Sequence, residues 1–364
     1  MRLSDILDYL HILAPLSFQE DYDNAGLIIG DPSGEITGAL ICIDVTEEIL
    51  DEAIGMGYNL VISHHPLIFS ALKKLTGSSL TERLVIKAIR SNLSIVAAHT
   101  NLDNVREGVN GILCEKLGIL NPTVLRPLEG KLRKLVTFCP AGFAGKVRES
   151  LFAAGAGQIG NYDSCSFNLP GQGTFRALQG ANPFVGRLDE LHTESEIRIE
   201  VIYPAHIEKQ LLKTLRDVHP YEEVAYDIYA LANAYPDAGA GMIGQLQSPA
   251  DPVEYLAFVK KTLQLGCLKY STVPEGKISK IAVCGGAGSF LIRDAITAGA
   301  DLFLTGDIRY HEFFLPVKSM ILGDIGHYES EQFTKELVFT RLKEKFPTFA
   351  LQISGISSNP IKYL

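Results

Sequence analysis

Short runs of apolar residues alternate with amphipathic, helix-like segments along most of the 364-residue chain. Each run has the length of a strand and leads into polar residues, glycine or histidine. Continuous apolar strands separated by helical patterns are typical of a mostly parallel sheet covered on both faces, so the expected fold class is α/β. The expected strands are "GALICID" (38–44), "NLVIS" (59–63), "SIVAAH" (94–99), "KIAVCGG" (280–286), "DLFLTGD" (301–307) and "SMILGD" (319–324).

Part of this pattern occurs twice. A shift of 242 positions places Cys42 on Cys284 and aligns "AIGMGYNLVIS" with "AITAGADLFLT". A second pair, "SIVAAHTNLD" and "SMILGDIGHY", aligns at a shift of 225. Any two helix–strand units of an α/β protein share some of this pattern. We interpret the repeat as a duplication that produced two similar α/β halves, residues 1–126 and 233–364.

The segment between these halves, residues 127–232, has an order of elements of its own. It contains the strand "KLVTFCP", the helix "GKVRESLFAAG", the strand-like "NYDSCSFN" and "TFRALQG", the strand "EIRIEVIYP", the helix "HIEKQLLKTLRDV" and the strand "EVAYDIYAL". This βαββαβ order predicts a ferredoxin-like domain inserted into the core. Within it, "NLPGQGTFRALQGANPFVG" (168–186) is rich in Gly, Pro and Asn and predicts a mobile hairpin or loop.

Composition restricts the classes of function. Hydrophobic residues make up 46% and charged residues 21% of the chain, as in ordinary globular proteins. A net charge of -9 argues against a nucleic acid partner, because neutralisation of phosphates drives non-specific binding. Six dispersed cysteines without a C-x-x-C pair, an acidic amphipathic start and no apolar stretch long enough for a bilayer predict a cytoplasmic protein without a membrane partner.

Three of the strand ends carry side chains that ligate metals. His64 and His65 follow the second strand, and Asp103 lies four positions beyond the end of the third. His327 and Glu331 follow the last strand at an i, i+4 spacing, which places both on one face if a helix begins near residue 326. We expect all three loops to follow strands of one sheet and to converge at its carboxyl edge. The predicted metal ligands are therefore His64, His65, Asp103, His327 and Glu331.

The number and type of these ligands favour a pair of metal ions. Neighbouring residues at a strand end point in different directions, so His64 and His65 suit two adjacent ions better than one. Five ligands suffice for two ions if a carboxylate or water bridges them. Imidazole and carboxylate ligands favour zinc first, with iron or manganese as alternatives, over magnesium or calcium.

The sequence also gives expectations for the remaining histidines and for a glycine-rich turn. His99 and His311 are candidates for contact with the ligands or a substrate. His219, in "HPYEEVAYD", is expected to be structural, and His11, His192 and His206 are expected to be ordinary surface or core residues. The turn "CGGAGSF" (284–290) fits either a tight turn or an anion cradle, although it lacks a complete phosphate-binding motif.

Six motifs taken in order resemble the NIF-three-like family, whose bacterial members carry the name "GTP cyclohydrolase 1 type 2 homologue". They are "DYDNAGLIIGD", "SHHPLIF", "AAHTNLDN", "CGGAGS", "TGDIRYHE" and "GDIGHYESE". The family's pattern falls on His64, His65, Asp103, His327 and Glu331, and the resemblance implies a dinuclear metal centre there. The inserted segment, through "HPYEEVAYDIY", is similar to a family subset with a PII/CutA-like module, for which the resemblance implies a toroidal homohexamer.

The expected function follows from the metal site. Two cations that bridge a water would supply hydroxide and polarise a C=O, C=N or P=O bond, so hydrolysis of a nucleotide-like or other small molecule is the expected reaction. GTP cyclohydrolase activity is implied by resemblance only. The alternative is a regulatory or scaffold assembly in which the metal site is structural or sensory and the insert binds an effector. A catalytic pair keeps an open or water-filled position, whereas a structural site is closed.

Overall fold

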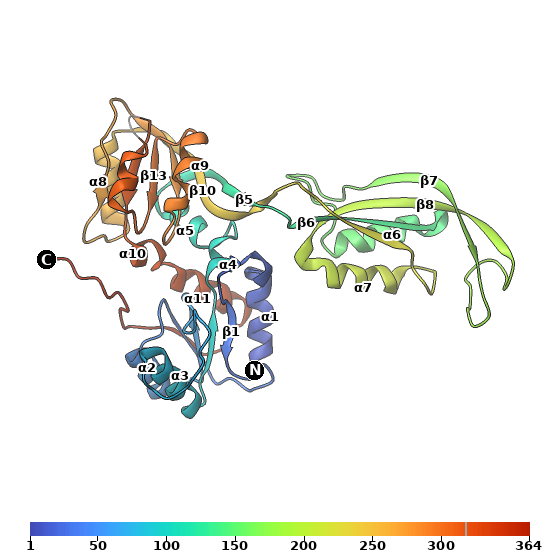
Figure 1. Cartoon of the computed structure of the whole chain (residues 1–364), viewed down its shortest axis with the longest axis horizontal. Helices are drawn as coiled ribbons and strands as arrows, with labels where there is room; N and C mark the ends of the chain where they lie inside the picture. The colour runs from blue at the N-terminus through green and yellow to red at the C-terminus, as the bar shows by residue number, and fades with distance from the viewer. Residues whose placement is uncertain (317–318) are drawn as a thin grey trace. The chain divides into compact units, whose positions relative to one another are not determined.

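The computed structural model describes residues 1–316 and 319–364, and the chain divides into two compact units (Figure 1). The core unit comprises Met1–Pro127 and Asp237–Leu364, and the middle unit comprises Leu128–Pro236. Helices and strands alternate along the core unit, which confirms the predicted α/β class. Among the described residues, no helix is both long enough and apolar enough to cross a membrane.

A five-stranded sheet forms one lobe of the core unit, in the order β1-β4-β3-β2-β15. Its strands are β1 (Gly26–Ile29), β2 (Ala39–Cys42), β3 (Leu60–Ser63), β4 (Ser94–Ala97) and β15 (Leu351–Ile353). All neighbours are parallel except β1, which runs antiparallel to β4. Apolar side chains of α1 (Leu3–Leu13) and α11 (Thr334–Lys345) pack on one face, and those of α2 (Glu47–Gly55) and α3 (Leu80–Arg90) pack on the other. Burial on both faces explains why the central strands β2, β3 and β4 are mostly apolar.

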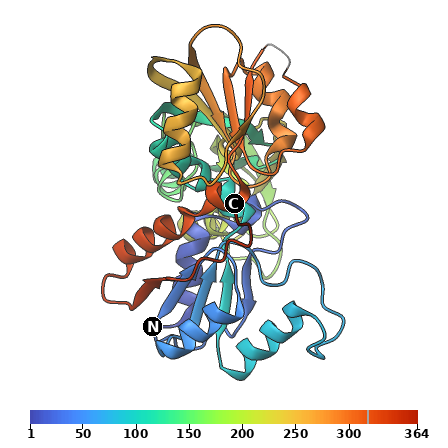
Figure 2. The same cartoon turned by 90° about the vertical axis from the view of Figure 1, so that its left-hand side faces the viewer.

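A six-stranded sheet forms the other lobe, in the order β11-β14-β13-β12-β10-β5 (Figure 2). Its strands are β5 (Ile119–Leu128), β10 (Tyr235–Ala250), β11 (Lys269–Tyr270), β12 (Ile278–Val283), β13 (Leu302–Thr305) and β14 (Ile321–Asp324). The strands β12, β13 and β14 are parallel, while β10 and β11 pair antiparallel with β12 and β14. α5 (Val109–Lys116) and α8 (Pro252–Thr262) pack on one face, and α9 (Ile292–Thr297) packs on the other.

The middle unit has a four-stranded antiparallel sheet in the order β7-β8-β6-β9. Its strands are β6 (Leu132–Pro140), β7 (Phe167–Arg176), β8 (Leu191–Pro204) and β9 (Tyr226–Ala230). The helices α6 (Ala144–Ala153) and α7 (Glu208–Val218) bury their apolar faces in the same hydrophobic cluster as β6 and β8.

Of the predicted hairpin or loop over residues 168–186, the first half agrees with a hairpin, because β7 extends to Arg176 and pairs antiparallel with β8. Pro170 opposes Ile197 of β8, and β7 is an edge strand of its sheet. Proline and glycine are tolerated on an edge, where half of the backbone groups have no strand partner. The turn-like composition therefore marks the edge of the sheet.

Candidate metal centre

The five predicted ligands come from three elements at strand ends. His64 and His65 directly follow β3, Asp103 is the last residue of α4 (Thr100–Asp103), and His327 and Glu331 begin and end α10 (His327–Glu331). The expectation that all three loops follow one sheet is wrong, since β3 and β4 belong to the five-stranded sheet and β14 belongs to the six-stranded sheet. Parallel strands look alike in sequence, so their division between two sheets was not visible there.

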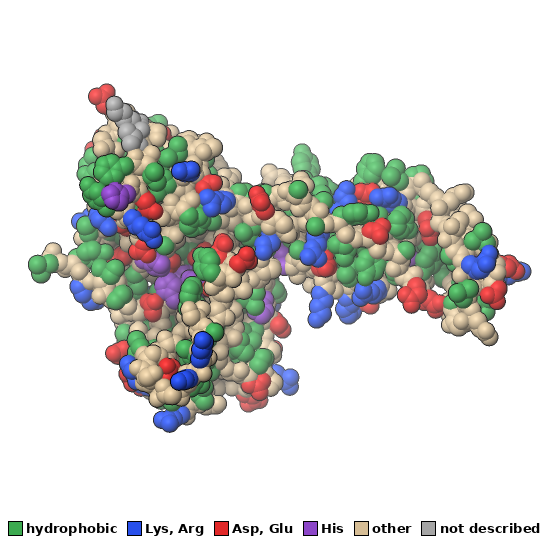
Figure 3. Space-filling view, in the orientation of Figure 1, with side chains coloured by type: hydrophobic (Ala, Val, Ile, Leu, Met, Phe, Trp, Pro, Cys, Tyr) green, Lys and Arg blue, Asp and Glu red, His purple; other side chains and the backbone are tan. Residues whose placement is uncertain are grey.

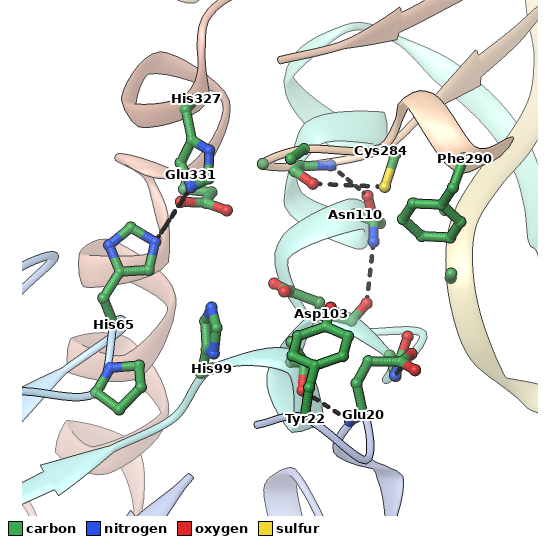
Figure 4. A pocket seen from close by; sticks show the side chains of 18 of the residues that line it. Glu20, Tyr22, His65, His99, Asp103, Asn110, Cys284, Phe290, His327 and Glu331 are labelled. Atoms are coloured by element: carbon green, nitrogen blue, oxygen red, sulfur yellow. Dashed lines mark hydrogen bonds and ion pairs between the residues drawn. The ribbon is translucent and has the colours of Figure 1, made fainter. Parts of the chain in front are cut away.

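The buried Glu331 carboxylate lies among the imidazoles of His64, His65 and His327, and Figure 4 shows the last two beside it. Its Oε1 is 3.6 Å from Nε2 of His64, and its Oε2 is 3.0 Å from Nε2 of His65 and 3.3 Å from Nε2 of His327. Asp103 Oδ1 lies 3.6 Å from His64 Nε2. The ligand atoms of His64, His65 and Glu331 all lie within 4.8 Å of one another, so this cluster could hold a metal ion.

The other ring nitrogen of each histidine is held by a fixed acceptor. His64 Nδ1 donates to the carbonyl oxygen of Ala98 at 2.8 Å. His65 Nδ1 donates to Asp44 and His327 Nδ1 donates to Asp307, both at 2.7 Å. A proton on Nδ1 leaves the Nε2 lone pair free for a metal, which is the usual arrangement around ligating histidines.

Sequence reasoning missed Asp44 and Asp307. Each lies two residues beyond a parallel strand, Asp44 after β2 and Asp307 after β13. Asp307 also has a φ of 56°, a conformation that aspartate tolerates better than most residues. A search for acids shortly after every predicted parallel strand would have found both.

The cluster is strongly coupled electrostatically. Burial alone would raise the pKa of Glu331, but the neighbouring imidazoles outweigh it and hold that pKa well below its ordinary value. Burial opposes a charge on His65, yet hydrogen bonds to Asp44 and Glu331 raise its pKa to about 10. The hydrogen bond to Glu331 leads in raising the pKa of His327 to about 9. Burial raises the pKa of Asp103 to about 6.

Three ligand atoms have unmet bonding capacity. Within the described part of the chain, His64 Nε2, Asp103 Oδ1 and Glu331 Oε2 are buried without a hydrogen-bond partner. Buried polar atoms are rarely left in this state unless a water or ion completes them. Cations bound among His64, Asp103 and Glu331 would satisfy these atoms, so the residues present fit the metal site that the sequence predicts.

Comparison with known proteins agrees with the motifs and the fold. The family model Duf34/NIF3 (NGG1p interacting factor 3) matches residues 1–360. The chain belongs to the DUF34/NIF3 family. It is 35% identical to the "GTP cyclohydrolase 1 type 2 homolog" of Bacillus subtilis (strain 168), with 99% of this chain and 98% of the relative covered. A protein of the same name from Halalkalibacterium halodurans is 36% identical, with 96% of both chains covered.

A solved structure shows the same NIF3-family architecture. The crystal structure of a Bacillus cereus protein related to NIF3 is 34% identical, covers 100% of this chain and 99% of its own, and superposes with a TM-score of 0.87. The resemblance inferred from the six motifs is therefore confirmed as family membership.

A cavity of about 530 Å³ opens beside the cluster. His65, His99, Asp103, His327 and Glu331 contribute to its lining, and Figure 3 shows histidine side chains at the surface of the core unit. The rest of the lining includes aromatic, amide and acidic side chains, among them Tyr22, Phe69, Phe290, Asn104, Asn110 and Glu20. Sequence reasoning did not find these six, because such residue types carry no metal-site signal and are brought to the cavity only by tertiary packing.

Of the two histidines considered for outer roles, only His99 lines the described cavity. Its Nδ1 lies 2.7 Å from Asp23, and its ring centroid lies 5.4 Å from those of both His64 and His65. His311 lies exposed in a 3-10 turn (Tyr310–Phe314) and contacts Tyr310. In the middle unit, His219 is buried, with Nε2 donating to the carbonyl oxygen of Phe138. This agrees with its expected structural role.

The glycine-rich turn 284–290 is explained by packing. The N–H groups of Gly285, Gly286 and Gly288 donate to the side chains of Asn110, Ser330 and Thr305, at 2.9, 2.9 and 2.8 Å. Donors that are already satisfied do not form an anion cradle. The tight turn is therefore the better of the two interpretations.

Gly286 gives a test of how closely Glu331 is held. A Cβ at Gly286 would lie 2.3 Å from Glu331 Oε1, and the residue has a φ of 63°. A non-glycine residue at this positive φ costs roughly 1 kcal/mol or more of folding stability. In addition to this cost, we expect Gly286→Ala to displace the carboxylate and weaken metal binding. Gly276→Ala is the matched control, since Gly276 has a φ of 109° with no atom within 4 Å of its Cβ position. Equal metal affinity in both variants, measured by competition with a chelator, would contradict this placement of Glu331.

Proposed function

We propose that the chain is a hydrolase that uses two divalent metal ions held by His64, His65, Asp103, His327 and Glu331. The arrangement of Glu331 carries the proposal. Oε1 faces His64, which also faces Asp103, and Oε2 faces His65 and His327. One carboxylate with a different histidine set at each oxygen suits a bridge between two ions, and such ions are typically about 3.5–4 Å apart. Zinc is the first candidate for this ligand set, and iron or manganese are alternatives.

The bound ions would lower the pKa of a shared water and polarise the bond to be cleaved. The protein supplies orientation and a route for protons. Asp44 and Asp307 fix the rings of His65 and His327 through their Nδ1 atoms. His99, fixed in the same way by Asp23, is placed on the cavity wall to exchange a proton between its Nε2 and the substrate or water.

The lining favours a planar, uncharged substrate. Tyr22 and Phe69 lie with ring centroids 6.3 Å apart on the lining, which also includes Phe290. None of the described lining residues is lysine or arginine. The relatives' name suggests GTP, whose triphosphate would have to be held without a lysine or arginine from this lining. We therefore propose that an unsaturated ring is recognised by the aromatic side chains and that a triphosphate adds little to binding.

Metal analysis followed by substrate comparison tests this function. We expect close to two transition-metal ions per native chain by elemental analysis and none in the double variant His65→Ala with Glu331→Ala. The metal-loaded protein should then be assayed with GTP, guanosine and related heterocyclic amides. Absence of metal under every loading condition would overturn the hydrolase proposal. Two bound ions with no vacant coordination position would favour the regulatory or scaffold alternative.

The role of His99 can be separated from metal binding. We expect His99→Gln to lower kcat by about 10²–10⁴-fold, the usual contribution of a positioned acid or base, while leaving the metal content unchanged. His311→Gln is the control, because His311 is exposed and does not line the described cavity. Similar rates for native and His99→Gln protein would exclude a role for His99 in proton transfer.

We also propose an origin for the chain's organisation: a duplicated α/β unit forming one core, interrupted at residues 127–232 by a ferredoxin-like, PII/CutA-like domain. The order β9-β6-β8-β7, with all neighbours antiparallel, supports the ferredoxin-like assignment. The two parallel sets β2-β3-β4 and β12-β13-β14 support the duplication. A homohexamer remains a proposal, to be tested by light scattering of the full chain.

A further inference from the structure

The turn His219–Glu223 of the middle unit, "HPYEE", is fixed from within. Buried His219 donates through Nε2 to the carbonyl oxygen of Phe138 and accepts the N–H of Tyr221 at Nδ1, at 2.9 and 3.1 Å. Burial lowers the pKa of His219, which keeps the ring neutral and suits it to this donor–acceptor role. The hydroxyl of Tyr221 donates to Glu196 of β8 at 2.9 Å. The turn therefore holds Tyr221 in one position.

A cavity of about 330 Å³ lies against this turn. Its walls include three aromatic rings, with the centroid of Tyr221 6.2 Å from that of Phe175 and 6.3 Å from that of Phe184. Phe175 lies in β7, and Phe184 lies in the segment after it. The cavity is thus lined by residues that are far apart in the sequence of the middle unit.

Three carboxylates share this cavity with the rings. Glu196, Glu222 and Glu223 line it, and Arg176 is the one basic residue among its described lining. Glu222 Oε1 accepts the N–H of Asn182 at 2.8 Å, which ties the turn to the segment that carries Phe184. A Cβ on Gly173 would lie 2.1 Å from Glu196 Oε2, so the glycine makes room for that carboxylate.

We propose that this cavity binds an organic ammonium ion, with a methylated ammonium group preferred over a primary amine. Several aromatic faces within about 6 Å of a cation, with carboxylates nearby, form the arrangement that recognises quaternary ammonium groups. Two of these carboxylate oxygens, Oε1 of Glu196 and Oε1 of Glu222, already accept bonds from Tyr221 and Asn182, which reduces the hydrogen bonding that they offer to a primary amine. Methylation also lowers the cost of removing water from the cation. An anion would meet three carboxylates against one arginine.

Choline and its neutral carbon isostere, 3,3-dimethylbutan-1-ol, provide the test on the full chain. Titration followed by calorimetry or NMR should show saturable binding of choline and much weaker binding of the isostere. We expect Phe175→Leu and Phe184→Leu each to weaken choline binding by about tenfold, the value of one cation–π contact. Phe167→Leu is the matched control, since Phe167 is exposed on the same strand and does not line the described cavity.

Each outcome decides the proposal. Charge-dependent binding that is lost in the two cavity variants and retained in Phe167→Leu supports it. Equal binding of choline and its isostere would show an apolar cavity without cation recognition and overturn it. Absence of saturable choline binding to the native chain would overturn it as well, and this comparison does not depend on whether any variant folds.

Discussion

Glu331→Gln is expected to empty the proposed metal centre. The carboxylate lies within 3.6 Å of Nε2 of His64, His65 and His327, so within the described cluster it faces all three histidines. An amide keeps the volume but loses the charge and one acceptor oxygen. We expect the loss in affinity to exceed the roughly 10- to 100-fold that removal of an outer-shell partner costs. Elemental analysis should show about two ions in the native chain and almost none in the variant.

Glu329→Gln is the control on the same helix. Glu329 is also buried in α10, but its Oε1 accepts from Asn359 and the residue does not line the described metal cavity. Loss of metal from both variants would point to general damage to α10. Native metal content in Glu331→Gln would contradict the bridging role of this residue.

The strand ends explain how much of the site the sequence could predict. Histidines and carboxylates directly after apolar strands are identifiable because residue type and position agree, and the structure places all five in one cluster. That they hold metal stays a prediction. The single sheet was wrong because hydrophobic runs do not reveal which strands pair with one another. The aromatic lining was not predicted, since Tyr22 and Phe290 meet at the cavity only after the two lobes pack.

The edge strand β7 was harder to predict from the sequence than the buried strands. β7 contains Pro170 and two glycines, which indicate a turn when the chain is read locally. Its hydrogen bonds to β8 override that local preference. Conversely, β2, β3 and β13 are buried throughout, and these were predicted because burial on both faces makes the strand a nearly continuous apolar run.

The affinity for metal is expected to rise steeply with pH. In the metal-free fold, hydrogen bonds to Asp44 and Glu331 raise the pKa of His65 to about 10, and those to Glu331 and Asp307 raise that of His327 to about 9. A metal must displace both protons, so each contributes up to about a tenfold gain in affinity per pH unit below its pKa. Burial opposes a charge on His64, yet Glu331 and Asp103 raise its pKa as well. Zinc competition with a chelator between about pH 6.5 and 9 should therefore show log affinity rising with pH at a slope of at least two.

The metal-free fold should respond to pH in the opposite direction. His65 and His327 have higher pKa values in the folded than in the unfolded chain, where the ordinary value is 6.5. The stability that their protonation contributes is complete below about pH 6.5 and is lost as pH rises toward 9 and 10. The difference in Tm between zinc-loaded and metal-free protein should thus widen over this range. His65→Ala should remove one of the displaced protons and reduce the slope of log affinity against pH by about one. A slope that is unchanged in His65→Ala, or that is flat in the native chain, would show that these imidazoles do not exchange protons for metal.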